Sequence, residues 1–222
     1  MDKLFLVANL KSYKTQSEAN EWLENFKIIR DSKQNLTQKE IIICPPFQLL
    51  FTFSSYIKEN NLPVKLGAQD VSPFGEGAYT GEVNAKQLVD YCNYVIIGHS
   101  ERRQYFKEDD DMLKNKVQSA WSKGVMPIFC VQNENAFIPE EVSIVAYEPV
   151  FAIGSGTPDT PENAEVVARS IRSKKNNLKV LYGGSVDSLN VKNFTSKENL
   201  NGVLVGGASL DSLEFLKIVE NA

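Results

Sequence analysis

Eight short apolar runs, rich in branched residues and spread over the whole chain, constrain its fold more than any other feature. They occupy residues 4–8, 41–44, 64–66, 94–97, 126–131, 144–147, 180–182 and 203–205. Each run is nearly continuous in hydrophobicity, which is typical of parallel strands that are covered on both faces. The sequence therefore predicts eight buried strands in one parallel sheet.

Segments with helical periodicity separate most of these runs. Apolar residues at spacings of three and four form three stripes, namely Ala19, Trp22, Leu23, Phe26 and Ile29, then Met112, Leu113, Val117, Ala120 and Trp121, and finally Val166, Val167 and Ile171. Before the third stripe, Thr160 suits the N-cap and Pro161 the first helical position. Strands that alternate with helices indicate repeated βα units.

The 222 residues allow about 28 for each of eight βα units, which is compact for a (β/α)8 barrel of usually about 250 residues. No linker or shift in composition divides the chain, so we expect one domain over residues 1–222. An open, doubly wound sheet has the same periodicity but normally carries a glycine-rich turn after its first strand. Here the pairs Gly183-Gly184 and Gly206-Gly207 follow the last two runs, where barrels bind phosphate. We therefore predict an α/β fold of the (β/α)8 barrel type.

The connection between the fifth and sixth runs is unusually short. Little more than residues 132–142 lies between them, and Pro139 interrupts that stretch. A crossover between parallel strands takes about a dozen residues at least, so no room remains for a normal helix. We predict that the helix between strands five and six is reduced or absent.

Composition excludes several classes of protein. The chain is 42% hydrophobic and 23% charged, which is typical of a globular protein, and its net charge of -4 offers nothing to DNA or another polyanion. No apolar run is long enough to span a membrane, and no secretory signal precedes the first run. Three widely spaced cysteines without a C-x-x-C pair favour reduced thiols in a cytoplasm. The single histidine, His99, excludes any metal site that needs two.

Residues whose side chains could take part in catalysis or binding follow the predicted strands at their carboxyl ends, where barrels carry their active sites. They are Asn9 and Lys11 after the first run, His99 after the fourth, Glu148 after the sixth, and Ser185 and Ser209 in the two glycine turns. Taken singly, each has an ordinary structural explanation. Together, a carboxylate, an imidazole, an ammonium and two anion-binding turns suit proton abstraction next to the carbonyl of a phosphorylated substrate.

Long motifs in the same order resemble the triosephosphate isomerase family. They are ANLK at 8–11, GAQD at 67–70, GAYTGEV at 77–83, IGHSERR at 97–103, AYEPVFAIGSG at 146–156, LYGGSV at 181–186 and LVGGASL at 204–210. The resemblance covers nearly the whole chain and implies a TIM barrel. It also implies interconversion of dihydroxyacetone phosphate and D-glyceraldehyde 3-phosphate through an enediolate, in glycolysis and gluconeogenesis.

The resemblance assigns a role to each site residue. Glu148 would be the catalytic base, neutral His99 the electrophile, and Lys11 and Asn9 the groups that stabilise negative charge, with Glu101 in a supporting position. The substrate phosphate would bind backbone N–H groups of Gly154, Ser185, Gly206 and Gly207, which need no net positive charge. Apolar lid residues, among them Ile153, would keep the base dry. The reaction requires no metal and no organic cofactor.

Two further expectations follow from the resemblance. The long stretch 67–82 would form the dimer loop of a homodimer, with Thr80 reaching the neighbouring subunit's site. The lid departs from the family, because Phe151 and Asn133 replace a Trp and a Glu, and Pro158 stiffens the second hinge. We expect Gly154–156 to close with a pivot nearer Phe151; alternatively, Pro158 only stabilises the following turn.

Two rival functions share some of these features. Another phosphate-binding barrel, such as an isomerase of phosphoribosyl aminoketoses, would have the same glycine turns without requiring these His99 and Glu148 motifs. A non-catalytic barrel that binds phosphorylated metabolites or protein partners would not need Glu148, His99 or Lys11, and all three are present.

Overall fold

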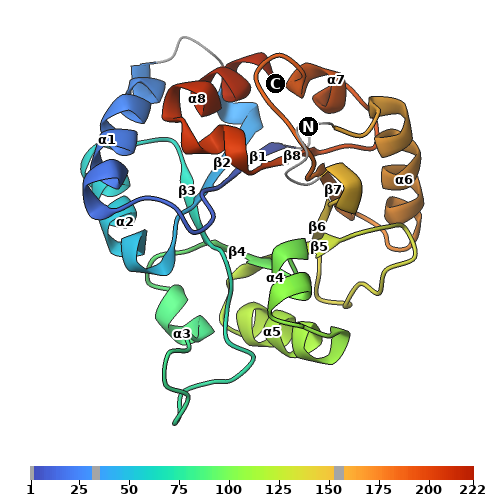
Figure 1. Cartoon of the computed structure of the whole chain (residues 1–222), viewed down its shortest axis with the longest axis horizontal. Coiled ribbons are helices and arrows are strands. Elements are labelled where there is room, and N and C mark those ends of the chain that lie inside the picture. The colour runs from blue at the N-terminus through green and yellow to red at the C-terminus, as the bar shows by residue number, and fades with distance from the viewer. Residues whose placement is uncertain (1–2, 32–35, 153–157) are drawn as a thin grey trace.

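The computed structural model describes residues 3–31, 36–152 and 158–222, and in these residues eight parallel strands close into a barrel in sequence order (Figure 1). The strands are β1 (Leu4–Asn9), β2 (Lys39–Cys44), β3 (Lys65–Ala68), β4 (Tyr94–Ile97), β5 (Met126–Val131), β6 (Ile144–Tyr147), β7 (Lys179–Tyr182) and β8 (Gly202–Val205). The ring closes where β1 pairs with β8, with Leu6 beside Val203. The predicted (β/α)8 barrel is confirmed.

Helices surround the barrel on its outside (Figure 1). They are α1 (Gln16–Phe26), α2 (Leu50–Glu59), α3 (Ala85–Leu88), α4 (Ser100–Tyr105), α5 (Asp110–Ser122), α6 (Pro161–Ser173), α7 (Val191–Thr195) and α8 (Ser212–Asn221). The loop between β3 and α3 extends away from the barrel at the lower edge of the view. No helix in the described part of the chain is long and apolar enough to cross a membrane.

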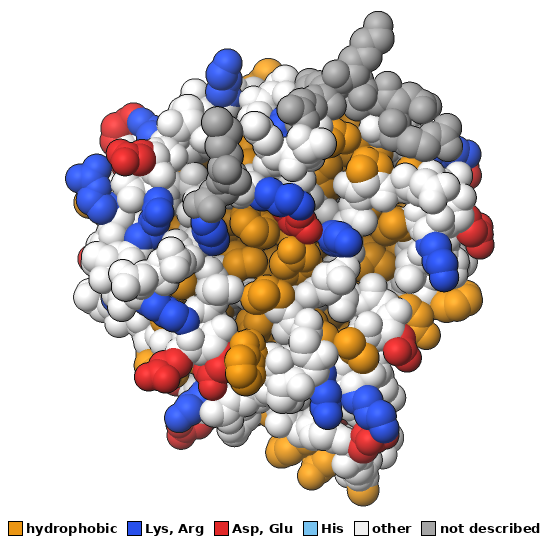
Figure 2. All heavy atoms as spheres, turned by 180° about the vertical axis from the view of Figure 1, so that it is seen from behind, with side chains coloured by type: hydrophobic (Ala, Val, Ile, Leu, Met, Phe, Trp, Pro, Cys, Tyr) orange, Lys and Arg blue, Asp and Glu red, His pale blue; other side chains and the backbone are white. Residues whose placement is uncertain are grey.

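The alternation of side chains along each strand divides the apolar core in two. Val7, Ile42, Ile96 and Leu204 belong to a cluster that fills the barrel, whereas outward residues such as Leu6 pack against the helices. Figure 2 shows apolar side chains gathered at the centre of one face, with charged side chains mostly around them. Each buried aliphatic side chain contributes about 1.5–3 kcal/mol, so both clusters stabilise the closed sheet.

Two of the three predicted helical stripes are partly wrong. The α1 stripe is buried throughout, but Met112 and Trp121 of α5 are 38% and 58% exposed, and Val166 of α6 is 62% exposed. On α5 the side chain of Lys116 lies buried instead. Spacings of three and four define a stripe, but they do not determine which edge of it faces the barrel. The predicted start of α6 is correct, because Thr160 is its N-cap and Pro161 its first residue.

No helix lies between β5 and β6, as predicted from the short connection. Two lysines at the end of α6 hold this connection by its backbone carbonyl groups. Lys174 Nζ donates to the carbonyl of Ala136 at 3.0 Å, and Lys175 Nζ donates to Val142 at 2.9 Å and also to Glu140. Beside them lies a cavity of about 780 Å³ lined by Phe137, Ile138 and Leu178, among others. Ammonium groups thus satisfy carbonyls that a crossover helix would have bonded internally.

We predict that Lys175→Met destabilises the protein by about 1–2 kcal/mol, because two carbonyl groups lose a charged donor. Chemical denaturation measures this difference, with Lys114→Met on the exposed face of α5 as the matched control. An equal free energy of unfolding for the two variants would show that the lysine contacts do not stabilise the helix-free connection.

Candidate active site

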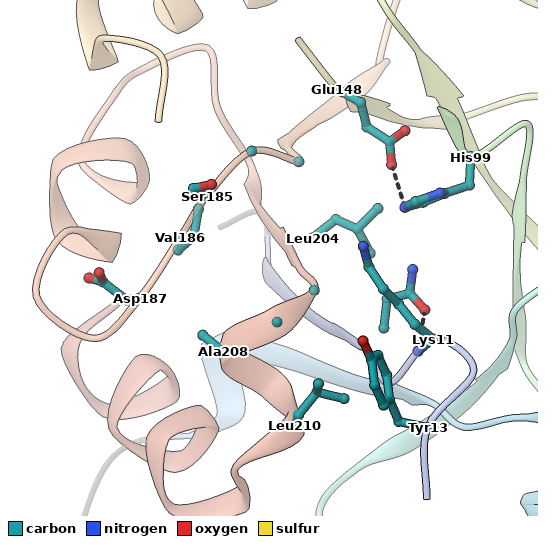
Figure 3. Close-up of a pocket in the computed structure, with 15 residues that line it drawn as sticks. Lys11, Tyr13, His99, Glu148, Ser185, Val186, Asp187, Leu204, Ala208 and Leu210 are labelled. Carbon is teal, nitrogen blue, oxygen red and sulfur yellow. Dashed lines mark hydrogen bonds and ion pairs between the residues drawn. The ribbon is translucent and has the colours of Figure 1, made fainter. Parts of the chain in front are cut away.

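A cavity of about 460 Å³ opens at the carboxyl ends of the strands (Figure 3). Residues from five strand ends line it: Asn9 and Lys11 at the end of β1, His99 after β4, Glu148 after β6, and the turns 183–187 and 206–210 after β7 and β8. Each of these residues follows a strand that sequence analysis predicted. The barrel therefore brings together residues that lie far apart in the chain.

Glu148 is almost fully enclosed at this site. It follows β6 directly, its N–H donates to the carbonyl of Val131 at 2.8 Å, and the residue is 1% exposed. One carboxylate oxygen, Oε2, accepts from the N–H of Ser100 at 2.9 Å, and the other, Oε1, lies 3.3 Å from His99 Nε2. In Figure 3 the two side chains point toward one another. Carboxylate and imidazole thus lie in direct contact.

A backbone N–H group orients the ring of His99. His99 caps the N-terminus of α4, and its Nδ1 accepts from the N–H of Glu101 at 3.2 Å. A nitrogen that accepts carries no proton, so this contact leaves Nε2 as the ring nitrogen that can donate a hydrogen bond. Nε2 therefore faces the cavity and Glu148.

Lys11 is held in an uncommon backbone conformation. Its φ is 50°, its N–H donates to Asn9 Oδ1 at 3.0 Å, and Gln69 Nε2 donates to its carbonyl at 2.9 Å. A lysine seldom adopts this left-handed backbone conformation, and surrounding contacts such as these maintain it. The side chain points into the cavity (Figure 3), and its Nζ lies 2.5 Å from Glu101 Oε1. Glu101 thus holds the ammonium at the site.

Both glycine turns lie so close to other site residues that an added side chain would have to displace one of them. A Cβ on Gly183 would lie 2.9 Å from Glu148 Cγ, and one on Gly206 would lie 3.0 Å from Lys11 Cε. These glycines therefore let the chain approach the carboxylate and the ammonium. Their role here is close approach, because neither has a positive φ.

Ser209 was expected among the candidate site residues, but it stabilises the last glycine turn instead. It is fully buried, its Oγ donates to the carbonyl of Gly206 at 2.7 Å, and its own carbonyl accepts from Trp22 Nε1 at 3.0 Å. Its hydroxyl therefore braces the last glycine turn from behind. Gly154 and Ile153 lie outside the described residues. Thr80 lies in the loop before α3 and does not line the cavity of its own chain.

Tyr13 lines the cavity and was missed by sequence analysis. It is more than half exposed, and Figure 3 shows it beside Lys11 and Leu210 at the rim. Its only signal is its place two residues after Lys11, in a loop where no periodicity indicates which way a side chain points. A lining tyrosine there is visible only in the folded chain.

A cluster of buried charges supports the histidine segment from outside the cavity. Arg102 lies 2.6 Å from Glu108 and 2.9 Å from Asp70, and Lys116 lies within 2.6 Å of both acids. Burial raises the pKa of Asp70, and the two cations partly oppose that rise. Glu108 is buried within this cluster, and Asp109 is the N-cap of α5.

Cys130 lies inside the barrel, near the carboxylate of Glu148. Burial is the largest cause of the raised pKa of its thiol, and the negative charge of Glu148 adds to it. A thiol that keeps its proton is a poor nucleophile, and Cys130 packs in the barrel interior instead.

A closed (β/α)8 barrel with a carboxylate, an imidazole and an ammonium at its carboxyl end is typical of barrel isomerases that transfer protons within small anionic substrates. Comparison with known sequences narrows this class. The family model described as triosephosphate isomerase matches residues 4–222. Proteins named triosephosphate isomerase from Dictyoglomus turgidum and Aquifex aeolicus are 38% and 37% identical, over 100% and 96% of this chain and 100% and 97% of their own. That from Mesomycoplasma hyorhinis is 37% identical, over 99% of this chain and 98% of its own.

The chain belongs to the triosephosphate isomerase family. Its activity is the family's interconversion of dihydroxyacetone phosphate and D-glyceraldehyde 3-phosphate. The alignment with the Dictyoglomus turgidum protein extends over 254 positions, whereas this chain has 222 residues. This chain therefore lacks residues that its relative has.

We predict that Gly183→Ala lowers kcat by about a hundredfold, because the added methyl displaces the Glu148 side chain and small displacements of a reacting group cost rates of that order. Steady-state kinetics measure this loss, and circular dichroism checks that the barrel is intact. The control is Glu59→Ala on the exposed surface of α2, away from the cavity. A kcat equal to that of the control would contradict the close approach between the turn and the carboxylate.

Proposed function

We propose that Glu148 is the base of the isomerisation and that neutral His99 is its electrophile. The observation that carries this proposal is the 3.3 Å contact between Glu148 Oε1 and His99 Nε2 in a buried cavity flanked by glycine turns. The pairing of a carboxylate base with a neutral histidine is the arrangement already established for this family.

The proposed mechanism moves one proton between two carbons. Glu148 takes a proton from the carbon next to the substrate carbonyl, and the electron pair left behind forms the enediolate. The Nε2 proton of His99 binds the oxygen on which negative charge develops, and His99 then moves protons between the two oxygens. Glu148 returns its proton to the neighbouring carbon, so atoms and charge balance. The substrate must displace the contact between Glu148 and His99 in order to enter between them.

The proposed phosphate site combines backbone donors with one cation. The N–H groups of Ser185, Gly206 and Gly207 lie in turns that line the cavity, and Lys11 supplies the positive charge. Gly154, which lies outside the described residues, completes the proposed set. Backbone N–H groups bind an anion without adding net charge, which explains how a chain of charge -4 takes an anionic substrate. Asn9 holds the backbone of Lys11, and Glu101 holds its ammonium.

The family match over residues 4–222 favours triose isomerisation over both rival functions, the phosphoribosyl aminoketose reaction and non-catalytic binding. A side-by-side assay with glyceraldehyde 3-phosphate and a phosphoribosyl aminoketose separates the two enzymes. Turnover of the triose alone supports the proposed function, and turnover of the aminoketose alone overturns it.

We predict that Glu148→Gln and His99→Gln each lower kcat by about 10²–10⁴-fold, the usual contribution of a general acid or base. An assay coupled to oxidation or reduction of a nicotinamide cofactor follows the reaction in either direction. Glu59→Gln on the surface of α2 is the control and should keep wild-type kcat. Full activity in Glu148→Gln would remove the base from the proposed mechanism.

We further propose one domain over residues 1–222 that works as a homodimer in the cytoplasm. The loop between β3 and α3 carries Phe74 and Tyr79, whose exposed rings stack at 4.4 Å. Beside the active site lies a second cavity of about 310 Å³, lined by Lys11, Glu101 and Phe106 among others. A partner's loop that inserted there would place Thr80 near the site and bury the aromatic pair. The three free cysteines support a reducing compartment.

We predict that the wild-type chain sediments as a dimer and that Thr80→Arg sediments as a monomer with reduced turnover, because a long charged side chain cannot enter the second cavity. Phe51→Asp replaces an exposed aromatic residue of α2 and should remain dimeric. A fully active monomeric wild type at sub-micromolar concentration would overturn the dimer proposal.

A further inference from the structure

Asp159 is a buried carboxylate between the start of α6 and the ends of β6 and β7. It lies just before the helix and is only 8% exposed. The N-cap of α6 is the next residue, Thr160, whose hydroxyl accepts from the N–H of Asn163 at 3.2 Å. Asp159 is therefore not needed to cap the helix, and its burial calls for another explanation.

The carboxylate of Asp159 is bound by neutral donors. Its Oδ1 accepts from the N–H of Thr160 at 2.8 Å, and its Oδ2 accepts from Asn163 Nδ2 at 2.7 Å and from the hydroxyl of Tyr147 at 3.4 Å. Burial of a carboxylate is costly unless several hydrogen bonds stabilise it, and these contacts come from both the helix and the barrel. Asp159 thus joins α6 to the end of β6.

The backbone of Asp159 makes a second connection, to the end of β7. Its N–H donates to the hydroxyl of Tyr182 at 2.7 Å. The ring of Tyr182 is fixed by stacking on Phe194 of α7 at 4.1 Å. The same hydroxyl lies directly against Gly184, because a Cβ there would come within 2.1 Å of it. The position of Asp159 is therefore coupled to the first glycine turn.

Both tyrosines stay protonated and so keep these contacts at neutral pH. Burial raises the pKa of Tyr182 to about 12, and burial together with the charge of Asp159 raises the pKa of Tyr147 further still. Tyr147 immediately precedes Glu148, and Tyr182 immediately precedes the turn that contains Gly183 and Ser185. One residue thus connects the backbone before the base to the backbone before the phosphate turn.

We propose that Asp159 is a positioning residue for the isomerisation, which sets the spacing between Glu148 and the turn at Ser185 through the hydroxyls of Tyr147 and Tyr182. This inference rests on the proposed roles of Glu148 and Ser185. Asp159 touches no reacting atom; it acts by holding two strand ends at one distance.

The two connections predict different kinetic effects. Tyr147→Phe breaks only the link to the base and should lower kcat about tenfold with little change in KM. Asp159→Ala removes the carboxylate and loosens the turn as well, so it should lower kcat and also raise KM and the inhibition constant of inorganic phosphate. Asp159→Asn keeps an acceptor oxygen and should restore most of the activity lost in Asp159→Ala.

Asp211→Ala is the matched control, because Asp211 caps α8 through the N–H groups of Leu213 and Glu214 and does not line the cavity. It should lower the melting temperature and leave kcat and KM unchanged. In the double variant Tyr147→Phe/Asp159→Ala, the kcat losses should not multiply, because both changes break the same hydrogen bond between Tyr147 and Asp159.

The assay separates this inference from the proposed function. If Glu148→Gln loses turnover while Tyr147→Phe and Asp159→Ala keep wild-type kcat and KM, the base assignment stands and the positioning role is overturned. If Asp159→Ala fails to fold, wild-type kinetics in Tyr147→Phe overturn the inference equally well. If Glu148→Gln is fully active, the proposed function itself falls.

Discussion

The pairing of β1 with β8 is the contact on which the rest of the structure depends. It closes the sheet, so that the carboxyl ends of all the strands meet around one opening and the inward side chains fill a common interior. Without it, Asn9 and Lys11 at the end of β1 would lie far from Ser185 and Gly206 at the ends of β7 and β8. Closure of the barrel thus brings motifs that are far apart in the sequence together in one site.

Within this opening, backbone groups and neutral hydrogen bonds do most of the positioning. His99 is oriented by the N–H of Glu101, Glu148 by the N–H of Ser100, and Lys11 by the side chain of Asn9. Such donors lie on short, well-packed segments at strand ends, so they hold a geometry at little entropic cost. Charged pairs lie mainly behind the site, around Arg102 and Lys116, where they fix α4 and α5.

The strands, and the meeting of polar residues at their carboxyl ends, were predictable because their signals are local. Continuous apolar runs identify buried strands, and residues at their carboxyl ends must converge once the barrel closes. Exposed Trp121 and buried Glu108 were not predictable in the same way, since the rotation of α5 against the barrel and the position of Arg102 determine them. Tyr13 and Asp159 depend on loop conformation, and residues 153–157, on which the predicted lid closure depends, lie outside the described residues.

The connection between β5 and β6 shows what a barrel requires of its helices. Strand pairing there is as regular as elsewhere, with Phe129 beside Val145 and Val131 beside Tyr147, although no helix covers the crossover. The backbone polar groups of the crossover still need partners, and the lysines at the end of α6 provide them. A helix is therefore one solution to hydrogen bonding and burial on the outside of the sheet. Glu148 at the end of β6 keeps its place because strand pairing, and not the crossover, determines it.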